Sequence, residues 1–357
     1  MKKIFLLLIL IFWPSFLWAA PSITGYTGTP AHGNELVVSG SSFGTGPTIH
    51  KWDDFEGETH TVGQDVGAGP GATAWSFNRA AHAKVSNTVC RTNSTKHALS
   101  DFDAQDAYAI GFQYAHGDTL SPIYVTWWWR WDSQGYEASA NWKPHWPVVY
   151  ENATPQQPRV SMCGQSEVSY CYGIDAGTHE TPEVVATNCD PFPAEDEWIR
   201  YEFFGIESDA DTANGTVVFL VQEENGGTFV TVFEYEGNIE THHEAAYHWT
   251  GCNFADYDSS KNYAIYTDDV YIANSRARVE IGDKSTWAAC TQREIQIPSA
   301  WAADEITFTV NAGSITNPAD GNYYLYVVDA DGAVNENGYQ LTSQPSMSGI
   351  IMRGSGF

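Results

Sequence analysis

The sequence predicts an all-β protein made of a jelly-roll β-sandwich and a smaller β-sandwich. Short apolar or alternating runs, bounded by Gly, Asp, Asn and Pro, occur throughout, and almost no window has an apolar stripe of helical period. Aromatic residues form 14% of the chain and 31 Gly can supply turns. Residues 29–44 and 277–340 also read as two halves of one small β-domain, into which a long segment of different character is inserted.

The N-terminus has the pattern of a secretory signal peptide over residues 1–20. Lys2 and Lys3 precede an apolar run from Ile4 to Leu17, and Ala19 and Ala20 supply small residues at the exit. The run is short for a membrane span, and no later segment approaches ~20 apolar residues. We therefore expect a chain that is secreted or held at the cell surface, with the periplasm as a further possibility, and no membrane span.

Net charge and cysteine content limit the partners that the protein can bind and indicate the compartment in which it folds. The chain has 44 acidic and 17 basic residues, a net charge of -27, which repels DNA and excludes a nucleic-acid partner. Acidity also serves solubility in exported proteins, so it identifies no partner by itself. The six Cys favour disulfides in an exported chain. Cys163 and Cys171 are near enough to staple one hairpin, and the other pairings stay open.

Strand candidates follow one another along the chain, and Asn225-Gly226 predicts a hairpin turn between two of them. Residues 151–158 and 175–197 lack alternation and are rich in Pro, Thr and acids, so long loops are expected there. The strand candidates are 35–39, 107–114, 123–131, 146–150, 198–206, 215–222, 228–235, 264–272, 305–310 and 323–328.

The strand pattern of the insert resembles a known superfamily. TrpAspAspPheGluGly (52–57) opens it, AspGluTrpIleArgTyrGluPhePheGlyIle (196–206) is followed by GlyThrValValPheLeuValGln (215–222), and TyrThrAspAspValTyrIleAlaAsn (266–274) closes it. This is similar to the concanavalin A-like jelly rolls of laminin G domains, glucanases and polysaccharide lyases, over roughly 51–275. The resemblance implies neighbouring first and last strands, and a concave sheet that binds glycans.

The flanking segments resemble an immunoglobulin-like IPT/TIG domain. The pattern lies in residues 32–44, 279–282, 305–313 and 324–332. The resemblance implies that 21–50 and 276–345 form one Ig-like sandwich, followed by a C-terminal tail at 346–357. Such domains usually run uninterrupted, so the strand order stays open although the β-sandwich class does not.

Acidic residues at both ends of the insert suggest a metal site. Oxygen ligands without a basic partner suit Ca²⁺, and neighbouring end strands would bring these groups together. The resemblance places Asp54, Glu56 and Asp269 at or beside a structural Ca²⁺. The alternative is that these acids face water at an edge strand.

The run from Trp127 to Trp131 gives the candidate ligand-binding surface. In a strand, Trp128 and Arg130 share one face, while Trp127, Trp129 and Trp131 share the other. One face fills the core, and the other is available to stack on sugar rings. The predicted ligand-binding residues are Trp128, Arg130, Trp142, His145 and Trp146. The alternative is that most of these Trp are core residues.

Few residues of the sequence are candidates for catalysis. The ExDxxE string of laminarinase-type hydrolases is absent, as are the Gln-x-His and Tyr-x-Lys strings of alginate-lyase-type relatives. His243 and His248 are too far apart for an HExxH zinc site, so 241–249 is expected to be a loop. The candidates for a β-elimination, which needs a cation and a Tyr or His base, are Lys143, His145, Tyr150 and Arg159.

The sequence thus predicts a secreted or surface carbohydrate-binding protein whose partner is an extracellular polysaccharide. A polysaccharide lyase or glycoside hydrolase on the same fold is the alternative. A structural or adhesion protein of the surface is a second alternative. The absence of the catalytic strings favours binding over catalysis.

Overall fold

The structure is a computed structural model that describes residues 19–343 with internal gaps. The gaps are 58–59, 67–74, 76–82, 103–108, 134–140, 150–158, 166–168, 179–180, 189–195, 224–225, 242–247 and 259–262. The backbone alone is described for residues 102, 109–111, 133, 141–149, 159–165, 169–178, 181–188, 255–258 and 263. Strands dominate, and the one helical turn in the described ranges is a 3-10 turn, η1 (Trp287–Ala289). No described helix is long and apolar enough to cross a membrane. The predicted all-β class is confirmed.

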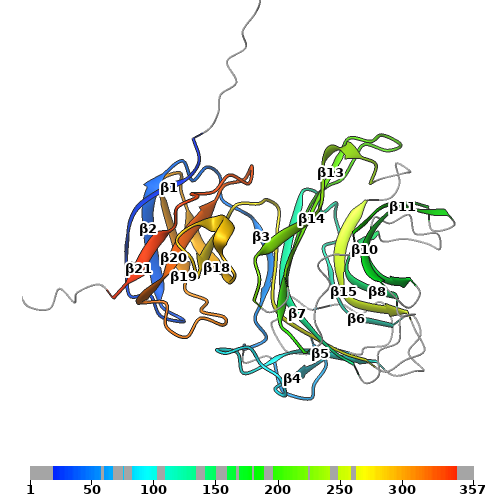
Figure 1. The fold of residues 1–357 in the computed structure, drawn as a ribbon, viewed down its shortest axis with the longest axis horizontal. Helices are drawn as coiled ribbons and strands as arrows, with labels where there is room; N and C mark the ends of the chain where they lie inside the picture. The colour runs from blue at the N-terminus through cyan, green and yellow to red at the C-terminus, as the bar shows by residue number, and fades with distance from the viewer. Residues whose placement is uncertain are drawn as a thin grey trace, which may run out of the picture.

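The small sandwich is built from both ends of the chain (Figure 1). Strand β2 pairs with β19, with Val38 opposite Ile306, so residues far apart in sequence share one sheet. Its core is lined by apolar side chains such as Leu36, Phe308 and Leu325. The IPT/TIG resemblance stays a prediction. The strand order is β1 (Ser22–Thr27), β2 (Glu35–Ser41), β19 (Glu305–Thr309), β18 (Arg293–Trp301), β17 (Arg278–Gly282), β20 (Asp320–Val328) and β21 (Tyr339–Thr342).

The large sandwich contains two antiparallel sheets. The eight-stranded sheet has the order β14 (Phe229–Ile239), β13 (Gly215–Gln222), β12 (Ile199–Ile206), β7 (Ile123–Ser133), β16 (Tyr263–Ala273), β5 (His97–Phe102) and β4 (Ala83–Ser86), with β3 (Ile49–Asp53) paired to β16. The six-stranded sheet has the order β11 (Thr181–Asn188), β10 (Ser169–Thr178), β9 (Arg159–Gln165), β8 (Asn141–Val149), β15 (Trp249–Asp258) and β6 (Ala109–Ala115). The six-stranded sheet lies on the side away from the small sandwich (Figure 1).

Aromatic side chains fill the space between these two sheets. Trp127 stacks on Tyr201 within the eight-stranded sheet, with ring centroids 5.2 Å apart, and meets Phe254 of the other sheet edge-on at 5.6 Å. Trp129 and Trp131 belong to the same buried cluster. The predicted division of the Trp run into two faces is therefore realised, and the odd-numbered face forms the core.

The opening and closing strands of the insert are neighbours. Strand β3 pairs with β16 antiparallel, with Asp53 opposite Val270 and Trp52 opposite Tyr271. The arrangement that the jelly-roll resemblance implied is thus present. It also brings both connections to the small sandwich to one place.

One expected loop is in fact a pair of strands. Residues 175–197 include the end of β10 and all of β11, which pair with each other from Tyr172–Asn188 to Thr178–Thr181. The expectation was wrong because β11 is an edge strand, where Pro182 is tolerated and a regular apolar alternation is not required. The other expected loop, 151–158, lies outside the described residues.

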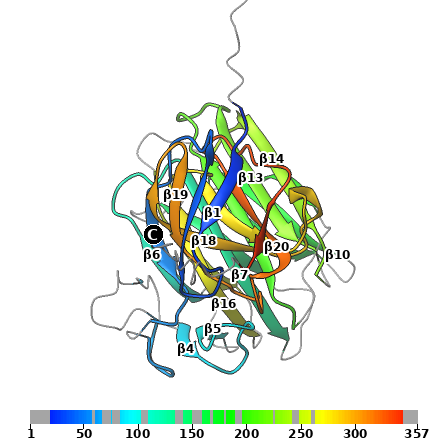
Figure 2. The same cartoon turned by 90° about the vertical axis from the view of Figure 1, so that its left-hand side faces the viewer.

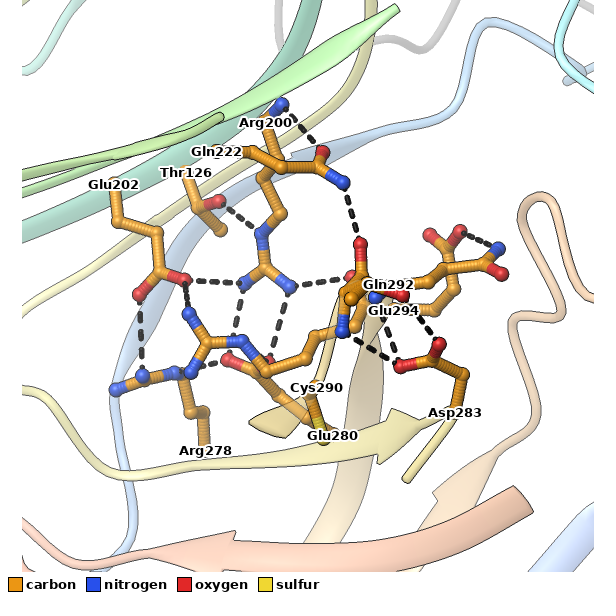
Figure 3. A network of polar contacts seen from close by, with 12 residues as sticks. Thr126, Arg200, Glu202, Gln222, Arg278, Glu280, Asp283, Cys290, Gln292 and Glu294 are labelled. Atoms are coloured by element: carbon orange, nitrogen blue, oxygen red, sulfur yellow. Dashed lines mark hydrogen bonds and ion pairs between the residues drawn. The ribbon is translucent and has the colours of Figure 1, made fainter. Parts of the chain in front are cut away.

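A buried network of charges joins the two sandwiches (Figure 3). Arg200 and Glu202 come from β12, whereas Arg278 and Glu280 come from β17 and Arg293 from β18. Their side chains are at most 7% exposed. Figure 2 shows the small sandwich in front of the larger one, with β18 and β20 overlying the region of β7 and β16. The small sandwich therefore covers part of the outer face of the eight-stranded sheet, where Tyr124, Phe204 and Tyr271 belong to one buried cluster with Ile295.

Candidate functional site

The outer face of the six-stranded sheet carries a polar row across three strands. On β15, Cys252 and Phe254 belong to the buried core, so Asn253 between them lies on the opposite face. On β6, Gln113 stands in the same relation to its neighbours. The strand register pairs Asn253 with Gln113 on one side and with Trp146 of β8 on the other.

The amides in this row are buried polar groups. Gln113 is 0% exposed and Asn253 is 1% exposed. The Oδ1 atom of Asn253 has no hydrogen-bond partner in the part of the chain that the structure describes. Buried polar atoms are paired in the great majority of cases, so an unpaired one indicates a place where another molecule can supply the partner.

Several predicted site residues belong to this same sheet. Trp142 pairs with Tyr257 and Lys143 with Asp256, both on β15, while His145 pairs with Val160 on β9. Arg159 begins β9. The structure thus brings Trp142, Lys143, His145, Trp146 and Arg159 into one sheet at the level of the backbone. Tyr150 lies outside the described residues.

A tyrosine–histidine pair stands at the end of β6. Tyr114 Oη lies 3.1 Å from His116 Nδ1, and the backbone N–H of His116 donates to Thr250 O at 2.7 Å. The His50 ring lies 4.6 Å from the His116 ring, centroid to centroid. Burial, and then the neighbouring His116, lower the pKa of His50, whereas burial raises the pKa of Tyr114. Two imidazole rings and one phenol are thus neighbours at this end of the strand.

A histidine–carboxylate pair lies at the start of β15. His248 Nδ1 is 3.0 Å from Glu207 Oε2, and Glu207 Oε1 accepts a hydrogen bond from the backbone N–H of Trp249 at 3.0 Å. A carboxylate on one ring nitrogen orients the imidazole for proton transfer at the other. The sequence alone does not indicate this pair, because the two residues are 41 positions apart. His243 lies outside the described residues, so the expected loop at 241–249 is described only at its ends.

Trp128 and Arg130 lie in the other sheet. Trp128 is 4% exposed, and the Arg91 guanidinium carbon is 4.0 Å from the centroid of its ring. Arg130 donates to Asp196 Oδ1 at 2.5 Å and lies over the Tyr266 ring. Because β7 belongs to the eight-stranded sheet, the structure does not bring these two residues together with Trp142, His145 and Trp146. The even-numbered face of the Trp run meets protein at Trp128.

The three predicted calcium ligands have other partners. Asp269 is paired with Arg91 and accepts a hydrogen bond from Asn311 at 3.2 Å. Glu56 accepts hydrogen bonds from the backbone N–H groups of Thr95 and Lys96. Burial is the main reason why the pKa values of Asp54 and Asp269 are raised.

In this arrangement these carboxylates do not fit a calcium ion. Calcium needs six to eight oxygen ligands, and the guanidinium of Arg91 occupies the place of a cation beside Asp269. Within the described ranges, no three His, Cys, Asp or Glu side chains gather as metal ligands. Calcium binding remains a prediction from the sequence. Removal of calcium with a chelator tests it.

Disulfides were expected, and the structure describes the side chains of three of the six cysteines. Cys90, Cys252 and Cys290 are free thiols. Cys163 and Cys171 are opposite each other in the β9–β10 pairing, as a hairpin staple requires of the backbone. That disulfide stays a prediction because only the backbone is described there, and Cys189 lies outside the described residues.

Comparison with solved structures finds proteins of similar strand arrangement at low identity. The alginate lyase Aly36B is 10% identical, with a TM-score of 0.45, and the match covers 64% of this chain and 97% of that chain. An endo-beta-1,4-glucuronan lyase from the fungus Trichoderma reesei is 10% identical, with a TM-score of 0.41 and coverage of 64% and 96%. The cellulose induced protein Cip1 is 16% identical, with a TM-score of 0.40 and coverage of 63% and 98%. No protein-family model matches the chain. No curated protein matches it either.

Proposed function

We propose that the protein processes an extracellular polysaccharide that contains uronate sugars, as a lyase, on the outer face of its six-stranded sheet. The observation that carries the proposal is the row of Gln113, Asn253 and Trp146, which joins two amides to an aromatic residue across three strands. Aromatic rings stack on the apolar faces of sugars, and amides bind their polar edges. Such a row suits a sugar chain that lies across the strands.

The proposed chemistry is a β-elimination. A base removes the proton at C5 of the uronate, the bond from C4 to the glycosidic oxygen breaks, and an acid returns a proton to that oxygen. The product carries a C4–C5 double bond, and no water is consumed. Because the carboxylate must be neutralised for the C5 proton to become acidic, the reaction needs a cation, for which Arg159 is proposed, while Asn253 Oδ1 can accept a hydrogen bond from a sugar hydroxyl.

Of the predicted catalytic residues, Tyr150 and Arg159 remain proposed for proton transfer and charge neutralisation, whereas Lys143 and His145 alternate with Trp142 and Trp146 and so take the opposite face of the strand. Lys143 and His145 belong to β8, the strand of Trp146, and Arg159 begins the neighbouring β9. The proposal for ligand binding retains Trp142 and Trp146, which share the face of Asn253. Arg130 and Trp128, on the other sheet, would affect sugar binding only indirectly.

The experiment is an assay of the full chain on polymers of mannuronate, guluronate, glucuronate and galacturonate, with a neutral glucan as the control substrate. Growth of ultraviolet absorbance from the unsaturated uronate identifies a lyase. New reducing ends without that absorbance identify a hydrolase, and binding without either product supports the carbohydrate-binding function. Neither product nor binding would overturn the proposal and favour a structural or adhesion role.

Variants connect the assay to the proposed face. Asn253→Ala and Trp146→Ala should each reduce the rate on the active polymer roughly ten- to a hundredfold, because each removes a group proposed to contact the sugar chain. Asn322→Ala, an exposed amide on β20 of the small sandwich, is the matched control and should leave the rate unchanged. Equal rates in all three variants would place the reaction elsewhere.

A further inference from the structure

A cavity of about 160 Å³ lies between the two sandwiches, away from the six-stranded sheet. The large sandwich contributes Tyr124, Glu202 and Phe204 to its wall, and the small sandwich contributes Arg278, Trp287 and Arg293. Arg276, in the segment that connects the two sandwiches, also lines it. Three of the charged side chains in the wall are therefore guanidinium groups and one is a carboxylate, in a chain with a net charge of -27.

At the centre of the network beside this cavity three arginines meet two carboxylates, while the Asp283 and Glu294 carboxylates that Figure 3 also draws pair with Lys284 and Arg91. Arg200, Arg278 and Arg293 face Glu202 and Glu280, and all five side chains are at most 7% exposed. If all five groups are ionised, one positive charge has no counterpart. A buried charge is costly unless an opposite charge compensates it.

Both glutamates in this network are held in the ionised form. Burial by itself would raise the pKa of Glu280, but Arg200, Arg278 and Arg293 outweigh that effect and hold the pKa at about 2. The same three arginines lower the pKa of Glu202 against the effect of burial. Burial raises the pKa of the adjacent Tyr124 well above its usual value, so its hydroxyl is neutral. Protonation of these groups therefore does not alter the excess of one positive charge at neutral pH.

Arg293 lines the cavity and retains hydrogen-bonding capacity. Its guanidinium carbon lies 3.7 Å from the Phe229 ring centroid and 3.9 Å from that of Trp287, so the group is held between two aromatic rings. Nη2 donates to Glu202 Oε1 at 2.8 Å. Nε has no hydrogen-bond partner among the described residues, and its nearest carboxylate oxygen, Glu280 Oε2, is 3.6 Å away. A fixed, buried donor without an acceptor favours an anionic ligand.

We propose that this cavity binds one small carboxylate anion. A single carboxylate supplies the missing negative charge, and its two oxygens match the planar fork of a guanidinium group better than a spherical anion does. The volume suits a small organic acid or the terminal sugar of a uronate chain. Binding of a terminal uronate sugar rests on the function proposed above. The carboxylate site itself does not depend on that function.

The first experiment measures the thermal stability of the full chain with increasing acetate, glucuronate, glucose or chloride at constant ionic strength. A saturable rise in Tm with acetate and glucuronate, and none with glucose or chloride, is expected. A rise with glucuronate but not acetate would indicate that the sugar is required. No saturable rise with either carboxylate overturns the site, and this outcome is independent of whether unsaturated products are formed from a polymer.

Charge variants locate the binding. Arg276→Gln should weaken carboxylate binding about tenfold and Arg276→Lys should preserve most of it, because Arg276 lines the cavity and its partner Glu236, at 2.9 Å, is 56% exposed and offsets its charge only in part. Glu202→Gln should strengthen binding about tenfold, a direction that loss of structure would not produce. If Glu202→Gln does not fold, the two Arg276 variants still test whether the carboxylate binds in this cavity. Equal affinity for Arg276→Gln and Arg276→Lys, with wild-type values in both, would overturn the assignment.

Discussion

Arg200 in the large sandwich and Glu280 in the small sandwich form a two-bonded ion pair across the interface. The Nη1 and Nη2 atoms of Arg200 donate to Oε2 and Oε1 of Glu280, both at 3.0 Å. Arg200 Nε also donates to Thr126 Oγ1 at 2.8 Å, and Nη1 to the backbone oxygen of Arg293 at 2.7 Å. The geometry of this guanidinium is therefore fixed from both sandwiches, and the pair aligns one against the other.

Removing one partner of this pair should strongly destabilise the protein. Arg200→Met leaves Glu280 with one arginine fewer in a buried place, which costs roughly 3–5 kcal/mol of unfolding free energy. Urea unfolding measured by Trp fluorescence tests this. Lys284→Ala, which removes an exposed ion pair with Asp283, is the control and should cost less than about 1 kcal/mol. Equal losses in the two variants would contradict the importance of the buried pair.

The same pair predicts a coupling energy. Arg200→Met combined with Glu280→Met should cost less than the two single changes added together, because the double variant leaves no unpaired charge of this pair. Additive losses would mean that each residue acts through its other contacts.

Stability should fall as the pH drops from about 6.5 toward 4, partly because of His97. This side chain is 0% exposed, and burial lowers its pKa from 6.5 to about 4. Because the folded protein holds the proton less tightly than the unfolded chain, the contribution is complete above pH 6.5 and is lost as the pH falls toward 4. The loss is at most roughly 3 kcal/mol.

The test compares urea unfolding at pH 7 and pH 5. His97→Phe keeps an aromatic ring near Tyr266, whose centroid is 5.3 Å from that of His97, and removes the titrating group. It should therefore lose less stability between the two pH values than the wild type does. His32→Gln, at an exposed position, should behave like the wild type. An unchanged pH dependence in His97→Phe would refute the role of His97.

Gly205 on β12 is expected to tolerate no larger side chain. A Cβ atom there would meet the Trp249 ring at 2.5 Å, and Trp249 is fully buried. Gly205→Ala should cost roughly 1–3 kcal/mol, since the ring or the strand must move in a filled core. Gly25→Ala, on β1, has no atom within 4 Å of the new Cβ and should be neutral or slightly stabilising. Thermal unfolding of the two variants tests this prediction. A loss of stability in Gly25→Ala but not in Gly205→Ala would contradict it.

The sequence could predict strands, their two faces and the pairing of the chain ends, but it could not say what covers each face. The alternation of β7 separates Trp127 from Trp128 because side chains on a strand point to opposite sides. Trp128 was expected to be available to sugars. Instead it lies against Arg91, which comes from a segment 37 residues earlier (128 minus 91) and forms an ion pair with Glu294 of the small sandwich. Contacts of this kind depend on how the sandwiches dock.

The same limit applies to the candidate site. Trp142, Lys143, His145 and Trp146 could be proposed from residue type and proximity in sequence, and the structure assigns them to one strand of the outer sheet. Asn253 and Gln113 could not be identified, because each is an isolated amide in a run of apolar residues. Only the strand register shows that they are neighbours. Their proposed role therefore begins with the structure.

Calcium chelation distinguishes the sequence-based prediction at Asp54, Glu56 and Asp269 from the arrangement in the structure. With Arg91 paired to Asp269, and backbone N–H groups donating to Glu56, we expect EDTA to leave the Tm unchanged. Arg91→Gln, in contrast, should lower the Tm by several degrees, because Asp269 and Glu294 lose their shared cation. If EDTA lowers the Tm and added Ca²⁺ restores it where Mg²⁺ does not, a calcium ion is bound. The carboxylates would then have to rearrange around it, since calcium needs oxygen ligands that the present hydrogen bonds engage.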